Sequence, residues 1–90
     1  MIKNITSDDI KNAVLKNNIT AWYPFRCSIC NEPYGYYFYN GIVTFDGACG
    51  CGTIFGERLS SYDEIVKLYN DNKNNKFGDE ILEYFKLDNN

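Results

Sequence analysis

Four cysteines in two close pairs are the residues of this sequence best suited to chemistry. Cys27 and Cys30 form a C-x2-C pair, and after 18 further residues Cys49 and Cys51 form a C-x-C pair. Thiolates are preferred ligands of zinc in structural sites, where four ligands surround the ion tetrahedrally. All four ligands would be cysteine, so no position stays open for water. We therefore predict one structural zinc ion bound by Cys27, Cys30, Cys49 and Cys51.

Disulfides and unrelated core positions account less well for the four cysteines. No secretory signal is visible after Met1, which predicts a cytoplasmic protein whose thiols stay reduced. A C-x-C pair is also awkward to bridge to itself. Unrelated core cysteines would not fall into two close pairs. Iron remains an alternative metal, because four thiolates can also hold it.

The segment between the two pairs predicts a β-hairpin. The run from Tyr34 to Tyr39 contains four tyrosines and a phenylalanine, residues that favour strands. Asn40-Gly41 is a strong signal for a type I′ turn, whose two central residues need positive φ. Residues 42–45 then form the returning strand. Because a hairpin returns to where it began, its ends should bring the two cysteine pairs together.

The flanking sequence predicts further elements. Thr6 or Ser7 can cap a helix that ends near residue 17, and Pro24 limits residues 19–25 to a short or edge strand. Ser61 and Glu64 have capping-box spacing. We expect an α+β fold with a zinc-ribbon-like hairpin or three-stranded antiparallel sheet, flanked by an N-terminal helix and two C-terminal helices. The remaining expected ranges are a third strand at 53–55, a polar loop at 70–76 and a last helix from Gly78 or Asp79.

The cysteine pattern resembles the zinc-ribbon class, in which two cysteine knuckles at the ends of a hairpin clasp zinc. The resemblance covers about residues 25–56 of a single domain spanning residues 1–90, and it rests on the four cysteines. Two features depart from the usual form: the second pair is C-x-C, and Asn31 follows Cys30 where glycine is usual. A treble clef, with the second pair at a helix start, therefore stays open. Zinc ribbons serve many functions, so the fold class does not supply one.

The sequence offers no constellation typical of an enzyme. It contains no histidine, which excludes Ser-His-Asp and Cys-His centres, and it has no glycine-rich phosphate-binding loop. No apolar run approaches the roughly 20 residues that span a membrane. We therefore expect a protein that is not an enzyme and has no membrane segment.

The charge of the chain favours a protein partner. The formal net charge is -3, and four thiolates with one zinc ion would make the sum more negative by two. Such a chain is poorly suited to nucleic-acid phosphates and better suited to a basic protein surface. The aromatic strands could still stack single-stranded bases, although the chain lacks the positive groove that such sites use. The candidate partner-binding residues are Tyr36, Phe38, Asp63, Asp79, Glu80 and Glu83.

These features predict a small acidic, zinc-stabilised protein-interaction module. In size, charge and a cysteine-bound metal the chain resembles small zinc-binding anti-CRISPR proteins of phages. That resemblance implies binding to a Cas effector, which is a host nucleic-acid enzyme, in the host cytoplasm. The heavy use of Asn, Lys, Ile and Tyr is typical of an AT-rich genome, as some phages have. The alternatives are a nucleic-acid-binding zinc ribbon and an accessory subunit of a larger complex.

Overall fold

The computed structural model describes residues 4–48, 51 and 54–87. The chain forms two compact units. The sheet unit is Ile19–Ser61, and the helical unit consists of Met1–Asn18 together with Tyr62–Asn90. The prediction of one domain over residues 1–90 stays a prediction, and the predicted ribbon core at about 25–56 lies within the sheet unit.

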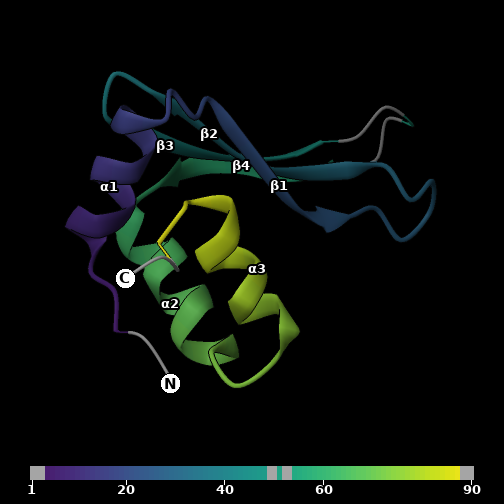
Figure 1. The fold of residues 1–90 in the computed structure, drawn as a ribbon. Coiled ribbons are helices and arrows are strands. Elements are labelled where there is room, and N and C mark those ends of the chain that lie inside the picture. Colours follow the sequence, from purple (N-terminus) through teal and green to yellow (C-terminus); the bar gives the residue numbers. More distant parts are fainter. Residues whose placement is uncertain (1–3, 49–50, 52–53, 88–90) are drawn as a thin grey trace. The chain divides into compact units, whose positions relative to one another are not determined.

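The sheet unit is a four-stranded antiparallel meander. Its strands are β1 (Ala21–Arg26), β2 (Pro33–Tyr39), β3 (Ile42–Ala48) and β4 (Ile54–Ser60), and they lie in the order β1-β2-β3-β4 (Figure 1). With the three helices this confirms the predicted α+β class. The expected three strands become four because β1 pairs with β2, and β4 is longer than the expected 53–55.

The central turn of the meander confirms the hairpin prediction. Tyr39 pairs with Ile42, so Asn40 and Gly41 alone join β2 to β3. Their φ angles are 50° and 78°, the positive values that a type I′ turn requires. This turn lies at one end of the sheet, and the β1–β2 and β3–β4 loops therefore share the opposite end.

A β-bulge shapes the edge strand β1. Trp22 pairs with Tyr36 and Phe25 pairs with Tyr34, so two residues of β1, including Pro24, oppose Gly35 alone. Proline has no amide hydrogen for a ladder bond and is tolerated at edges and bulges. The predicted edge position of this strand is therefore confirmed.

Alternation along the strands gives the sheet a buried face and an exposed face. The buried side chains include Trp22, Phe38 and Val43. At the centre of this face, the ring of Tyr36 stacks 5.8 Å from that of Trp22 and lies 5.4 Å from that of Phe45. Aromatic contacts of this kind add to the stabilisation that burial itself provides.

The helical unit contains α1 (Ser7–Lys16), α2 (Tyr62–Asn72) and α3 (Lys76–Tyr84). Thr6 caps α1 as predicted: its hydroxyl accepts from the Asp9 amide at 3.2 Å, and its own amide donates to the Asp9 carboxylate at 2.9 Å. The predicted loop at 70–76 and the start of the last helix need correction. Asn75 caps α3 by accepting from the amides of Phe77 and Gly78, so α3 begins at Lys76.

The helices of the described part of the chain are short. None of them is long and apolar enough to cross a lipid bilayer. The buried positions on them, which include the fully buried Ile10, Ile65 and Ile81, give each helix one apolar face.

Candidate metal centre

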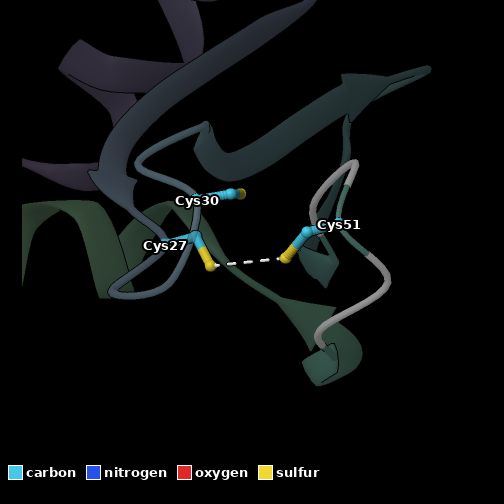
Figure 2. A group of neighbouring side chains, drawn as sticks. All are labelled: Cys27, Cys30 and Cys51. Atoms are coloured by element: carbon cyan, nitrogen blue, oxygen red, sulfur yellow. Dashed lines mark hydrogen bonds between the residues drawn. The ribbon is translucent and has the colours of Figure 1, made fainter.

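Two hairpin loops bring the cysteines together at one end of the sheet. The first loop runs from Cys27 to Glu32, between the paired residues Arg26 and Pro33. The second joins β3 to β4 and contains Cys51. Figure 2 shows the side chains of Cys27 and Cys51 facing each other from these two loops, with Cys30 beside them. The sequence prediction that the hairpin reunites the cysteine pairs is met for these three residues.

The distances fit ligation of one ion. The sulfur atoms of Cys27, Cys30 and Cys51 all lie within 4.8 Å of one another. The Cys27 and Cys51 sulfurs are 3.9 Å apart, which is close to the edge of about 3.8 Å in a tetrahedron with metal–sulfur bonds of about 2.3 Å. A disulfide would need about 2.05 Å, and these three cysteines are free thiols. They could therefore hold a metal ion.

Backbone hydrogen bonds shape the first loop around a sulfur atom. The Cys27 amide donates to the Glu32 carbonyl at 2.9 Å, and the Asn31 amide donates to the Cys27 carbonyl at 2.9 Å. The Ile29 amide donates to the Cys27 sulfur at 3.3 Å. An amide aimed at sulfur stabilises the thiolate form that binds metal. This tight turn, called the knuckle below, holds Cys27 and Cys30 in positions from which both could bind a metal ion.

Asn31 occupies the position at which the zinc-ribbon pattern usually has glycine. Its φ is 64°, in the left-handed region. Asparagine reaches this region more readily than other residues that have a Cβ. The departure from the zinc-ribbon pattern at this position therefore preserves the backbone conformation that glycine would supply.

Burial differs among the three cysteines. Cys27 is buried, Cys30 is half-buried and Cys51 is exposed. The guanidinium of Arg26 donates to the Asn31 carbonyl at 2.9 Å, which fixes a cation on the knuckle loop. Sequence reasoning missed this arginine, although its position next to Cys27 was a signal. Its charge would partly balance a negative thiolate–metal group.

The other predicted site residues fall in different places. Cys49 lies outside the described residues. Tyr36 and Phe38 are only 2% and 6% exposed. The acidic candidates are separate from the cysteines in the chain and belong to the helical unit: Asp63 is in α2, and Asp79, Glu80 and Glu83 are in α3. Their role in partner binding stays a prediction.

Comparison with known proteins adds no family. No protein-family model, curated protein or solved structure matches this chain. Evidence about function therefore comes from the sequence and from the three clustered cysteines.

The conformation of Asn31 gives a test of the knuckle. If the site holds a metal ion, Asn31→Val is expected to weaken its binding about tenfold, because the left-handed region costs a β-branched residue about 1–2 kcal/mol. Asn31→Gly should keep the metal affinity of the natural chain. Competition with a chromophoric chelator measures both affinities.

The matched control is Asn18→Val. Asn18 also has a positive φ, 53°, but it follows α1 in the helical unit. This variant should lose stability and keep its zinc affinity. Equal zinc affinity of the Asn31→Val variant and the natural chain would contradict the role given to Asn31.

Proposed function

We propose that this chain is a protein-interaction module whose sheet is held in shape by one structural zinc ion. One observation carries the proposal: the clustering of the sulfur atoms of Cys27, Cys30 and Cys51 at the end of the sheet where two hairpin loops meet. A metal there ties the β1–β2 hairpin to the β3–β4 hairpin, opposite the Asn40-Gly41 turn. Its contribution is to the fold, and the surfaces of the module contact the partner.

Zinc and a fourth thiolate complete the proposed site. Cys49 stands two residues before Cys51 in the same loop sequence, and its thiolate would fill the tetrahedron. A site of four thiolates leaves no coordination position for water, so it supports a structural and not a catalytic role. Zinc has no redox chemistry and binds such sites in its preferred geometry.

The interaction part of the proposal rests on charge and on missing catalytic groups. The chain has no histidine and a net charge of -3, which zinc thiolate ligation would make more negative. This favours a basic protein surface as partner over a nucleic acid. An inhibitor of a host nucleic-acid enzyme, such as a phage protein directed at a Cas effector, is the specific form that the anti-CRISPR resemblance suggests.

Metal content and ligand identity are tested together. Native mass spectrometry of protein purified without added metal should find one zinc ion per chain. Cobalt substitution should give the absorption of a tetrahedral thiolate site. Cys49→Ser should lower zinc affinity strongly, whereas Asp63→Ala should leave it unchanged. Bound iron, or a Cys49→Ser variant with natural affinity, would contradict this assignment.

The module itself is tested with its partners. Affinity capture from host lysate should recover a protein with the natural chain and lose it with the Cys30→Ser variant, and cross-linking should then map the contact to this chain. Tight DNA binding whose affinity falls steeply with salt concentration would refute the proposal and support a nucleic-acid-binding zinc ribbon. Capture of the same proteins by the natural chain and the Cys30→Ser variant would show that the zinc site is not needed for interaction.

A further inference from the structure

The exposed face of the sheet carries a continuous set of large apolar side chains. Tyr39, Leu59 and Ile42 are 75%, 76% and 54% exposed, and Tyr23 and Tyr37 also reach the surface. Strand register explains why they share one face: Tyr37 pairs with Thr44 and Thr44 pairs with Leu59. In the next row Tyr39 pairs with Ile42. Contiguous apolar surface of this kind marks a site of interaction.

The tyrosine pair on this face is ordered. The rings of Tyr23 and Tyr37 meet edge to face, with centroids 5.7 Å apart and an interplanar angle of 76°. A hydrogen bond with Tyr23, partial burial and electrostatic interactions with Tyr23 and Asp46 raise the pKa of Tyr37 to about 12. The face of the Tyr37 ring is electron-rich and attracts cations.

Two carboxylates lie on the same face. Gly35 pairs with Asp46, and Asp46 pairs with Glu57, so these acids stand side by side in the row next to Tyr37. The sheet unit contains no lysine.

We propose that this face, defined by Tyr23, Tyr37, Tyr39, Ile42, Asp46, Glu57 and Leu59, binds a protein segment in which arginine side chains alternate with apolar ones. The proposal deepens and rests on the proposed interaction module, because it assigns the contact surface and its partner chemistry. Guanidinium groups fit this face twice: they pair with carboxylates and stack on tyrosine rings. The apolar partner side chains would cover Ile42 and Leu59. A phosphate backbone, in contrast, would meet two carboxylates.

A defined peptide tests the partner chemistry. A short synthetic peptide of alternating arginine and leucine should bind the zinc-loaded chain, and a peptide of alternating glutamate and leucine should not. Amide chemical shifts should move in β2, β3 and β4 around the face residues. Binding of both peptides with similar affinity would overturn the proposal, as would shifts confined to the helical unit.

Paired variants separate the face from general electrostatics. Asp46→Asn with Glu57→Gln should weaken binding of the arginine peptide about tenfold. Asp8→Asn with Asp71→Asn removes the same charge from exposed positions of the helical unit and should leave the affinity nearly unchanged. Equal loss in the two pairs would mean that net charge alone attracts the peptide and would overturn the proposed face.

Two highly exposed side chains test the apolar part. Tyr39→Thr with Leu59→Thr keeps strand-favouring residues and should weaken peptide binding about tenfold. If the face instead joins two copies of this chain, sedimentation will show a concentration-dependent dimer that these substitutions abolish. If it binds nucleic acid, oligothymidylate will shift the same amides. Either result would overturn the partner chemistry proposed.

The captured partner distinguishes this proposal from the one on which it rests. A zinc-dependent partner that still binds the Tyr39→Thr, Leu59→Thr variant would leave the interaction module standing and refute this face. Absence of any zinc-dependent partner would refute the proposed interaction module, whether or not the synthetic peptide binds.

Discussion

Removal of the metal is expected to unfold the sheet unit. Affinity for a structural ion is folding free energy when the ligands meet only in the folded chain, so the loss should amount to several kcal/mol. Here the proposed ligands come from two loops of separate hairpins, one carrying Cys27 and Cys30 and the other carrying Cys51. For a chain of this size, each kcal/mol lowers the melting temperature by about 4–8 °C. Thermal melting after verified chelation should therefore fall by well over ten degrees.

The near-ultraviolet spectrum offers a second readout of the same loss. Trp22 and Tyr36 are stacked on the buried face of the sheet, so their signals should collapse as the strands separate. Amide exchange should lose protection along β1 to β4. Zinc added back should restore the signals and the protection.

A matched pair of variants in one loop isolates the ligand from the loop itself. Cys30→Ser should reproduce the effect of the chelator, because serine is a poor ligand for zinc at this site. Ser28 is exposed in the same loop, and Ser28→Ala should change neither zinc binding nor melting. An unchanged melting temperature after metal removal would falsify the structural role of the site.

The parts of the fold that were predictable have strong local signals. The turn at Asn40-Gly41 can be predicted from these two residues alone, because few other residue pairs accept two positive φ angles. The Thr6–Asp9 box is similarly local. Once the turn is fixed, an antiparallel meander forces its neighbouring loops to the opposite end of the sheet. The meeting of Cys27 and Cys30 with Cys51 follows from that topology.

The choice of exposed face could not be read from the sequence. The run from Tyr34 to Tyr39 is almost uniformly aromatic, so it lacks the alternation of polar and apolar residues that assigns faces. Tyr36 and Phe38 are the two aromatic residues among the six sequence candidates for partner contact, and both are buried in the structure. Their neighbours Tyr37 and Tyr39 take the surface instead. A shift of one residue in register exchanges the two sets.

The start of α3 could not be predicted from the sequence for a different reason. Residues 70–76 contain several asparagines, any of which could cap a helix or form a turn. The hydrogen bonds of Asn75 decide among them. In β4, Gly56 has a φ of 126°, a backbone state open mainly to glycine. A glycine in a strand weakens the sequence signal, which is why the expected strand ended at Phe55.

Gly35→Ala is expected to destabilise the sheet strongly although it leaves the cysteines intact. A Cβ at this position would lie closest to the carbonyl oxygen of Trp22, 2.6 Å from Cδ of Pro24 and 2.9 Å from Cα of Tyr23. These atoms belong mostly to backbone, so they cannot move aside without displacing β1. Forcing them apart should cost about 3 kcal/mol, at the upper end for overpacking.

The control for this change is Gly41→Ala. Nothing lies within 4 Å of a Cβ at Gly41, but its φ of 78° makes alanine strained. It should cost only about 1 kcal/mol, the usual scale of a conformational penalty without a clash. Chemical denaturation of the zinc-loaded variants measures both values. If the Gly35→Ala and Gly41→Ala variants are equally stable, the β1 bulge does not require glycine at position 35.

The same substitution links the fold to the proposed partner surface. Because Gly35 has no side chain, β1 can bulge over it and place Tyr23 against Tyr37 on the exposed face. Gly35→Ala should therefore abolish the edge-to-face contact and, with it, the raised pKa of Tyr37, whose largest cause is the hydrogen bond with Tyr23. Spectroscopic titration of the tyrosines should then show one phenol ionising at lower pH. An unchanged titration in a folded Gly35→Ala variant would show that the bulge does not position this pair.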